Sequence, residues 1–337
     1  MGPFGFRRAS VCLVLCLDSA NTALSPAQAH YLSTHRPFYY NTQAHLLDWC
    51  PDPILSLAVP ILAYWSSSIF FHILDVSGWK WLDRYRIHES PEVVARNLAS
   101  RGEVVRSVLL QQVMQTLAGL LWMEEQVSGE LVPHVANMLR LEPTLTRVLS
   151  GFLGEKLGAR TMDRDGARLL YAIYWWAIPT LRLLWCMFLM DTWQYFLHRT
   201  MHTNRWLYKH FHSVHHRLYV PYAFGASYNH PLEGFVLEAV GAGFAEVLSG
   251  MTTREAMFMF FFATVKGVDD HCGYRLPFDP LQRLTSNNAD YHDIHHQAIG
   301  MKSNYAQPFF VHWDTLLDTK MTRADMEQRR LSRKKQS

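Results

Sequence analysis

The stretch "ILSLAVPILAYWSSSIFFHIL", residues 54–74, contains no Asp, Glu, Lys or Arg, and Asp52 and Asp75 bracket it. At about 1.5 Å per residue, a helix of this length spans about 31 Å, which is the thickness of the hydrocarbon core of a bilayer. A buried helix of a soluble protein rarely runs this far without a charge. The stretch therefore predicts a membrane span, which Pro60 would kink.

Two further apolar stretches are candidate spans. The weaker one, "SVLLQQVMQTLAGLLWM" at 107–123, contains three amide side chains, Gln111, Gln112 and Gln115. These amides would have to face other helices, because lipid offers them no hydrogen-bond partner. The stronger one, "LLYAIYWWAIPTLRLLWCMFLM" at 169–190, contains Arg182. That guanidinium should face protein, water or lipid headgroups.

The apolar stretches "FVLEAVGAGFAEVLSG" at 235–250 and "AMFMFFFATV" at 256–265 flank the polar segment "MTTRE". They predict two helices that form a hairpin. Glu238 and Glu246 argue against two full crossings exposed to lipid. Together with the three spans, these helices predict an all-α fold, a polytopic membrane helical bundle.

The charge distribution predicts how this bundle is oriented. Residues 75–106, 191–234 and 271–337 are rich in Lys and Arg, whereas the loop 124–168 balances its bases with acids. Basic loops stay in the cytosol, so these three regions and the C-terminus are predicted to be cytosolic. The net charge of +3 is too small to indicate nucleic-acid binding.

Cysteine usage excludes two classes of site. The five cysteines, an odd number, are scattered and form no CxxC motif. A disulfide framework and a zinc ribbon are therefore not expected, and the thiols are predicted to be reduced. The compositional outlier is histidine, with 18 residues.

Histidines are concentrated in "HRTMH" at 198–202, "HFHSVHH" at 210–216 and "YHDIHH" at 291–296. Helical residues at i, i+3 and i+4 share a face, so the imidazoles of each stretch are predicted to point in one direction. Neutral imidazole is a common ligand for iron, copper, nickel and zinc. Three such stretches, all in segments predicted to be cytosolic, predict a His-rich cap that surrounds more than one ion.

The identity of the metal follows partly by exclusion. The eight clustered histidines exceed one tetrahedral zinc site, and neither HExxH nor the Glu and ExxH pattern of soluble di-iron bundles occurs. An all-imidazole site for two metals beside a membrane points to oxygen chemistry on a lipid. A membrane metal-binding protein without catalysis is the alternative from another class, and ionisable residues threading the spans would favour it.

The histidine pattern HxxxH, HxxHH and a late HxxHH resembles the fatty acid hydroxylase superfamily of membrane di-iron enzymes. That superfamily includes sterol desaturases, sterol methyl oxidases and sphingolipid hydroxylases. "HRTMHTNRWLYKHFHSVHHRLYVPYAFGA", "VDDHCGYRLPFDP" and "NNADYHDIHHQAIGMKSNYAQPFF" are similar to its branch of fungal sphinganine C-4-hydroxylases. The similarity covers roughly residues 54–320, and its specific part begins near residue 190.

The resemblance implies a set of iron ligands. Matched to the family motifs, the predicted ligands are His198, His202, His212, His215, His216, His271, His292, His295 and His296. His230, in "NHPLE", resembles an HP-E motif of sterol-oxidising relatives, and a helix-start role for it stays open. Metal-bound imidazoles usually donate their other N–H to a carboxylate or carbonyl. Candidates near the ligands in sequence are Asp191, Gln194, Asp269, Asp270, Asp290 and Asp293.

The resemblance also implies a reaction, in which a monooxygenase adds a hydroxyl group at C-4 of sphinganine or dihydroceramide. It would use two iron ions, O2, and electrons from NADH or NADPH delivered by cytochrome b5 and its reductase. No GxGxxG, CxxCH or HPGG string is present, so the electrons must come from another protein. A basic surface that could receive this donor includes Arg199, Arg205, Lys209 and Arg217. A sterol methyl oxidase or desaturase is the alternative enzyme, since the ligands fix the oxidant and not the substrate.

These expectations give a provisional map of the chain. An N-terminal extension covers residues 1–53, transmembrane helices 54–180, a fatty acid hydroxylase catalytic region 181–320, and a basic tail 321–337. Within the extension, "VCLVLCL" at 11–17 is too short to span a bilayer; a signal-peptide core and a poorly structured segment are both open. Lys334 and Lys335 form a dilysine pattern typical of endoplasmic-reticulum membrane proteins, and an ordinary basic tail is its alternative.

Overall fold

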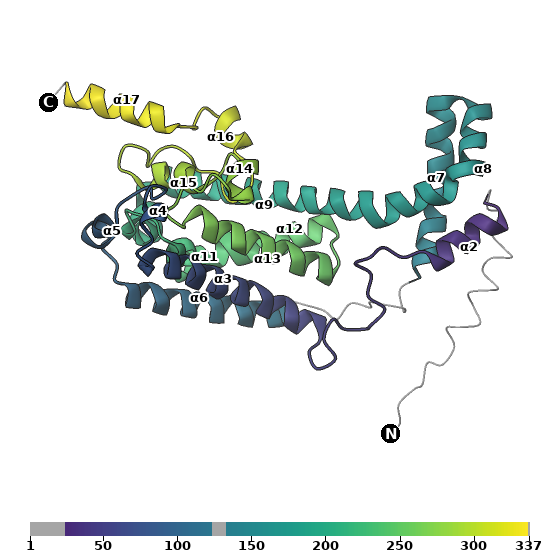
Figure 1. The fold of residues 1–337 in the computed structure, drawn as a ribbon, viewed down its shortest axis with the longest axis horizontal. Coiled ribbons are helices and arrows are strands. Elements are labelled where there is room, and N and C mark those ends of the chain that lie inside the picture. Colours follow the sequence, from purple (N-terminus) through teal and green to yellow (C-terminus); the bar gives the residue numbers. More distant parts are fainter. Residues whose placement is uncertain (1–23, 123–132, 336–337) are drawn as a thin grey trace. The chain divides into compact units, whose positions relative to one another are not determined.

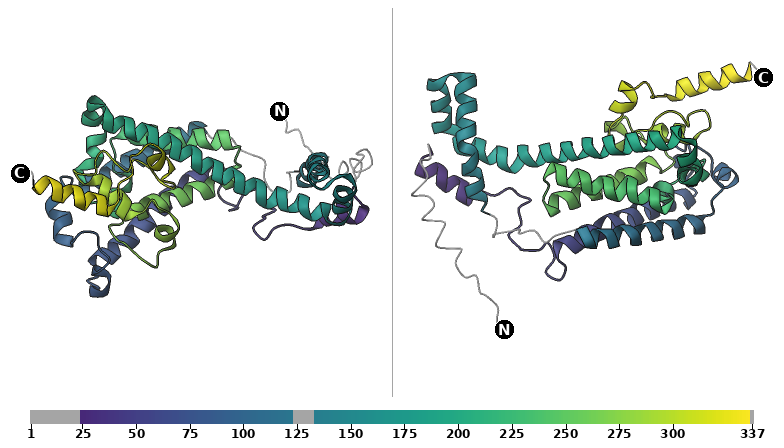
Figure 2. Two further views of the ribbon diagram at one scale, coloured as in Figure 1. Left: turned by 90° about the horizontal axis from the view of Figure 1, so that it is seen from above. Right: turned by 180° about the vertical axis from the view of Figure 1, so that it is seen from behind.

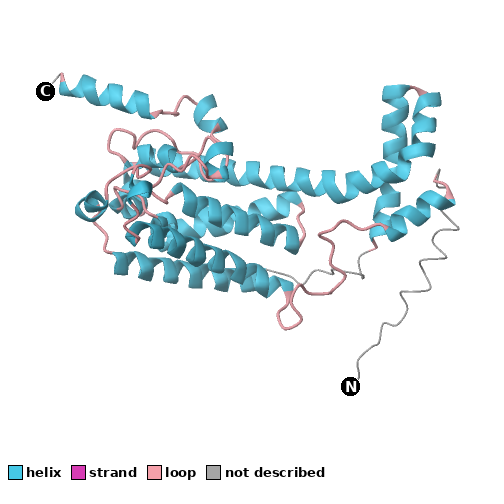
Figure 3. Ribbon diagram, viewed as in Figure 1, coloured by secondary structure: helices cyan, strands magenta, loops and turns pink. Residues whose placement is uncertain are grey.

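The computed structural model describes residues 24–122 and 133–335. The described residues form helices and loops, and their only β-type pairings are two isolated bridges, Leu47 with Cys50 and Arg86 with Tyr274 (Figure 3). The predicted all-α fold is confirmed. The stretch at 11–17 lies outside the described residues.

Spatial contacts divide the chain into two units, residues 1–44 with 127–180 and residues 45–126 with 181–337. The sequence-based boundaries at residues 53, 180 and 320 stay a prediction, because the two units are defined by contacts and not by role.

The first unit contains α2 (Pro26–Thr34), α7 (His134–Leu153) and α8 (Glu155–Ala172), and the chain continues as η2 (Ile173–Ala177). Helices α7 and α8 pack against each other and are joined at Gly154, whose φ of 80° lies in the region that favours glycine (Figure 1). Helix α2 is fastened to α8 by Gln28, which donates to the carbonyl oxygens of Met162 and Asp163.

The second unit is built on long apolar helices. These are α3 (Asp52–Val76), α6 (Arg101–Trp122), α9 (Ile178–Thr203, of which 181–203 belong to this unit) and α13 (Thr253–Asp270). Shorter elements connect them: α4 (Lys80–Asp83), α5 (Ser90–Arg96), α10 (Arg205–His210), η3 (His212–Arg217), η4 (Ala223–Ser227), α11 (Pro231–Gly234), η5 (Phe235–Val240), α12 (Gly241–Ser249), α14 (Pro280–Leu284), α15 (Ala289–His296), α16 (His312–Leu316) and α17 (Arg323–Lys334). Helix α13 packs along α3, as Figure 1 shows.

Three helices of the described chain are long and apolar enough to cross a membrane. They are Asp52–Val76, Arg101–Trp122 and the continuous helical stretch Glu155–Thr203. The first and third contain the predicted spans 54–74 and 169–190, and the second covers the described part of 107–123. Pro60 lies inside the first helix. Leu62 and Leu117 point outward, with 65% and 58% of their surface exposed. Such side chains suit lipid and not water, so the chain has the character of a membrane protein.

The polar groups inside the apolar helices are paired with protein. On α6, Gln111 and Gln115 donate to the carboxylate of Glu238, and Gln112 accepts from the indole of Trp65. The prediction that these amides face other helices is confirmed. Arg182 of α9 lies 3.4 Å from the carboxylate of Glu255, at the start of α13.

The predicted apolar hairpin is also present. Its first arm is η5 with α12, its second arm is α13, and Gly250 ends the first arm with a φ of 62°. Thr252 and Glu255 form a capping box, each side chain bonding the backbone N–H of the other, which fixes the start of α13. The last residue of α13 directly precedes His271, so the hairpin places that histidine.

Four elements converge at one end of the second unit. The end of α9, the short helix η3, the end of α13 and α15 all bring histidines there, as the ring distances below show (Figures 1 and 2). Asp191 of α9 accepts the backbone N–H groups of Phe309 and Phe310 at 3.1 and 2.6 Å. These bonds fasten the loop after α15 to α9.

Candidate metal centre

The nine predicted histidines gather into two neighbouring groups. The first histidine group comprises His198, His202, His212, His216 and His295, and the second comprises His215, His271, His292 and His296. Within each group, one ligand atom per residue lies within 4.8 Å of every other. Eight of the nine side chains are buried, and His202 is half-buried.

Each HxxHH stretch divides between the two groups. His212 and His216 join the first group and His215 the second, whereas His292 and His296 join the second and His295 the first. The prediction that all three imidazoles of a stretch share one direction is therefore wrong. Adjacent residues on a helix point about 100° apart, so the two histidines of an HH pair must diverge. In the α-helix α15, residues four apart come back to within about 40°, which keeps His292 with His296. The element η3 is a 3-10 helix, where that angle does not apply, and there His212 and His216 are brought together at their Nε2 atoms, which lie 3.1 Å apart.

The Nδ1 atoms of six of these imidazoles are engaged by oxygen acceptors. The pairs are His198 with Tyr305 O (2.9 Å), His212 with Glu233 Oε1 (2.5 Å), His215 with Tyr228 O (3.0 Å), His271 with Gly267 O (2.8 Å), His295 with Ser303 O (2.7 Å) and His296 with Leu218 O (2.7 Å). A carbonyl or carboxylate oxygen accepts only, so Nδ1 must carry the proton. The lone pair of each neutral imidazole is then on Nε2 and available to a metal.

The Nε2 atoms converge without being able to bond one another. His198 Nε2 lies 3.1 Å from His212 Nε2, and both atoms are acceptors once their Nδ1 atoms donate. Two lone pairs at this distance repel unless a cation lies between them. Metal–nitrogen bonds of about 2.1 Å at right angles place two nitrogens about 3.0 Å apart. The donor set and the spacing therefore fit a transition-metal ion.

Unpartnered atoms support the same conclusion for both groups. The Nε2 atoms of His215, His271 and His295 are buried and have no hydrogen-bond partner among the described residues. Buried polar atoms are normally paired, so such atoms require a ligand. Burial lowers the pKa of His215 to about 4 and that of His271 to about 3. Both rings are consequently neutral at pH 7, the form that binds metals.

Glu233 is the functional residue that sequence reasoning missed. It is 5% exposed, and its carboxylate accepts the Nδ1 proton of His212. Burial, with a smaller contribution from the negative charge of Glu238, raises the pKa of Glu233 to about 8, whereas a cation bound at the first group would lower this pKa and favour the carboxylate. The motif "HPLE" contained the signal, because its acid lies at the start of a helix directed towards the histidines.

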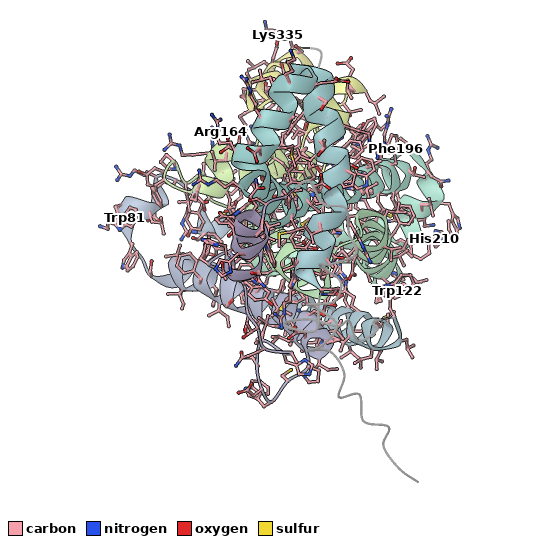
Figure 4. All side chains as sticks on the ribbon, turned by 90° about the vertical axis from the view of Figure 1, so that its right-hand side faces the viewer. Trp81, Trp122, Arg164, Phe196, His210 and Lys335 are labelled. Atoms are coloured by element: carbon pink, nitrogen blue, oxygen red, sulfur yellow. The ribbon has the colours of Figure 1, made fainter. Side chains whose placement is uncertain are left out.

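His230 itself lies outside both histidine groups. It is the N-cap of α11, where its Nδ1 accepts the backbone N–H of Leu232 at 3.3 Å. Its ring packs edge-on against Phe211, with 4.9 Å between centroids. The helix-start role is the one that the structure supports. His210, which was not predicted as a ligand, is exposed and lies on the outside of the side chains in Figure 4.

The five acids and the one amide that lie near the ligands in sequence have other surroundings. Asp191 holds the loop after α15, Gln194 lines a cavity, Asp269 accepts from Gln282, Asp270 pairs with Lys266, and Asp290 and Asp293 pair with Arg323. None of the six bonds an imidazole of the nine within the described chain. Asp293 also accepts from His88 at 2.7 Å, which links α15 to the loop before α5.

A cavity of about 680 Å³ opens beside the second histidine group. Its walls come from α3, α6, η5, α12 and α13, and they include His271 and His292. Most of the wall is apolar, with a few polar side chains such as Gln115, Gln194 and Glu238. Ligand pockets are typically of this kind, apolar with a few placed polar groups and about 300–1,000 Å³ in volume. An apolar substrate in this cavity would lie against the second group.

Comparison with known proteins agrees with this geometry. The model of the family described as "Fatty acid hydroxylase" matches residues 183–319, which include all nine histidines. The sphingolipid C4-hydroxylase of Saccharomyces cerevisiae is 46% identical over 274 residues, 81% of this chain and 73% of that protein. Sphinganine C4-monooxygenase 2 of Arabidopsis thaliana is 41% identical over 268 residues, 80% of this chain and 88% of that protein.

Sterol-oxidising relatives match over a smaller part of the chain. Methylsterol monooxygenase 1 of Danio rerio is 36% identical over 149 residues, 43% of this chain and 48% of that protein. No solved structure matches the chain.

Proposed function

Since this chain belongs to the fatty acid hydroxylase family, we propose that it is a membrane monooxygenase that hydroxylates C-4 of sphinganine or dihydroceramide. The product would be a phytosphingosine-type lipid. The observation that carries the proposal is the apolar cavity that opens on His271 and His292. The relatives named as C4-hydroxylases support the substrate, because they match over about four fifths of the chain, whereas the methylsterol relative matches over less than half.

The two histidine groups would each hold one iron ion, so that all nine histidines serve as ligands. Bound iron would supply the redox chemistry that activates O2, which no side chain of the protein can provide. The hydrogen bonds at Nδ1 fix the orientation of the rings and leave the lone pair of each Nε2 available to a metal, which supports this assignment.

The cavity would supply the remaining requirements of the reaction. C-4 of a saturated chain bears no acidic proton, so general acid–base catalysis cannot open its C–H bond. The protein must hold this carbon beside the oxidant and keep water away. A site that opens on an apolar cavity suits this task, and it favours catalysis over the alternative of a membrane protein that only binds metal.

The electrons would come from NADH or NADPH through cytochrome b5 and its reductase. Of the four basic residues predicted to receive such a donor, Arg205 and Lys209 have exposed side chains. Arg217 is instead engaged by Glu103, with which it forms an ion pair. A double variant, Arg205→Glu with Lys209→Glu, should slow turnover at limiting cytochrome b5 and weaken its salt dependence. An unchanged salt dependence would argue against docking at this surface.

The protein would reside in the endoplasmic-reticulum membrane with its histidines and C-terminus in the cytosol. The basic loops and the Lys334–Lys335 pattern support this orientation. Residues 54–180 would serve mainly as membrane helices and 181–320 as the catalytic region, with 1–53 and 321–337 as terminal extensions.

Expression in cells that lack C-4 hydroxylation tests the proposal. Trihydroxy long-chain bases should appear with the wild-type chain and should be absent with His215→Ala. If the bases stay dihydroxy while sterol intermediates change, the sterol oxidase alternative takes the place of this function.

A further inference from the structure

The carboxylate of Glu238 lies in a cradle of three amides. Its Oε2 accepts from Gln111 Nε2 at 2.8 Å and from Gln115 Nε2 at 3.0 Å, and its Oε1 accepts from Asn229 Nδ2 at 3.1 Å. The donors come from α6 and from the loop before α11, so residues far apart in sequence meet at this carboxylate. Hydrogen bonds from neutral donors favour the ionised form of a carboxylate without neutralising its charge.

One acceptor position of this carboxylate remains free. A carboxylate has about four lone-pair positions, and the three amides occupy three of them. The open position belongs to Oε1, which accepts only from Asn229. The Glu238 side chain also lines the apolar cavity. Burial raises the pKa of Glu238 to about 7 and the three amides oppose that rise, whereas no cationic side chain within residues 24–122 and 133–335 contributes.

The cradle depends on a glycine at the right place. A Cβ at Gly234 would overlap Oε1 of Gln111, so only glycine lets this amide approach Glu238 across the helix. A carboxylate at the wall of an apolar cavity is costly unless a cation pairs with it. A cradle that hydrogen-bonds such a carboxylate, leaves one acceptor position open and faces it into the cavity is a binding site for a cation that arrives with the ligand.

Glu238 also lies close to the metal centre. It follows Glu233, the hydrogen-bond partner of His212, by little more than one helical turn, and its negative charge acts on Glu233. The cavity that Glu238 lines also contains His271 and His292. In a sphingoid base, only C-3 separates the carbon that bears the amine from C-4. A group that binds the amine therefore fixes where C-4 lies.

We propose that Glu238 binds the 2-ammonium group of a free sphingoid base, so that the free base, and not its N-acyl derivative, is the preferred substrate. This inference rests on the proposed function. The ammonium donates to the open position on Oε1 and completes the shell of the carboxylate. An N-acylated amine is neutral and leaves Glu238 as an unpaired charge. The cavity, at about 680 Å³, also has the volume of a site for one chain-like ligand.

The test compares Glu238→Gln with the wild type in the full-length membrane protein. The probes are sphinganine and N-acetylsphinganine, which differ in charge while the acyl group stays small. A hydrogen bond to a charged group contributes about 1.5–3 kcal/mol, so kcat/KM for sphinganine should fall about 10–100-fold, mainly through KM. For N-acetylsphinganine, kcat/KM should change less than about threefold.

Glu255→Gln is the matched control, because it makes the same chemical change outside the cavity and keeps the capping box of α13. It should leave both KM values unchanged. Equal losses of Glu238→Gln with both probes would show that Glu238 only stabilises the fold, and would overturn the inference. A wild type that prefers N-acetylsphinganine would overturn it as well.

A binding measurement separates this inference from the proposed function. The dissociation constants of the two probes from the purified protein measure recognition of the ammonium group without any turnover. Tighter binding of sphinganine that Glu238→Gln abolishes supports the inference even where C-4 is not the atom oxidised. Equal affinity of the wild type for the two probes overturns it even where C-4 hydroxylation occurs.

Discussion

His215 and His216 are neighbours in the sequence, yet their imidazoles belong to different groups. His216 Nε2 lies 3.1 Å from His212 Nε2 in the first group, whereas His215 joins His271, His292 and His296 in the second. His295 and His296 divide in the same way. The rings of the two neighbouring pairs lie 5.6 and 5.9 Å apart, centroid to centroid. Two peptide bonds thus tie the groups together and fix the separation of the ions that they would bind.

His215→Ala and His216→Ala should each remove a ligand from a different ion. Metal analysis of the purified protein should find two bound ions in the wild type, one per group, with iron as the active metal, and a lower content in each variant. Turnover should fall by more than about 100-fold, because partners that only orient a ligand already cost about 10–100-fold. His45→Ala, outside both groups, is the control and should be mild. A wild type without bound transition metal after iron-replete expression would contradict the two-ion assignment.

Glu233→Gln should weaken metal binding at the first group. The substitution replaces the carboxylate that accepts the Nδ1 proton of His212 and orients its ring. Loss of such a partner costs about 10–100-fold in metal affinity. In a competition titration, the chelator should therefore remove one ion from the variant at a lower concentration than it removes the other. Asp290→Asn, which alters a pair with Arg323 instead, should titrate like the wild type.

The sequence predicted the spans and eight of the nine histidines because both signals are local, whereas His271 was predicted from the family resemblance alone. The length of residues 54–74 and their lack of charge are enough to indicate a membrane span. Histidines three or four residues apart can likewise be recognised in the sequence without a structure. The division of each HH pair could not be predicted from the i, i+3, i+4 rule alone, since the rule does not say where the ions lie. Asp191 and Asp293 do not bond any of the nine predicted ligands, because nearness in sequence is not nearness in space. Glu233 reaches His212 only because the chain folds back between them.

Gly234→Ala should disturb the amide cradle through Gln111. The added methyl would overlap the end of that side chain, and overpacking of this kind costs about 1–3 kcal/mol of stability. We expect a lower thermal midpoint of the detergent-purified protein and a higher KM for sphinganine. Gly102→Ala, with open space around its Cβ, is the control on the same helix as Gln111. A second substitution, Gln111→Ala, should restore stability to Gly234→Ala; no recovery would mean that the strain lies elsewhere.

A glycosylation acceptor placed after Ser337 should stay unmodified, because the basic loops and tail predict a cytosolic C-terminus. Glycosylation is detected as a lower gel mobility that treatment with a glycosidase reverses. An acceptor in the loop at 124–168, which the predicted spans on either side of it place opposite the basic regions, is the positive control. Modification of the C-terminal acceptor would reverse the orientation and place the histidines on the lumenal side.

The most direct measurement uses purified protein, cytochrome b5 with its reductase, sphinganine and isotopically heavy oxygen gas. Mass spectrometry then locates any new hydroxyl group on the product. The heavy isotope should appear in a hydroxyl at C-4, and His295→Ala should give no such product. A product hydroxylated at another carbon, or a C-4 hydroxyl whose oxygen comes from water, would contradict the assignment of this chain as a sphingoid-base C-4 monooxygenase.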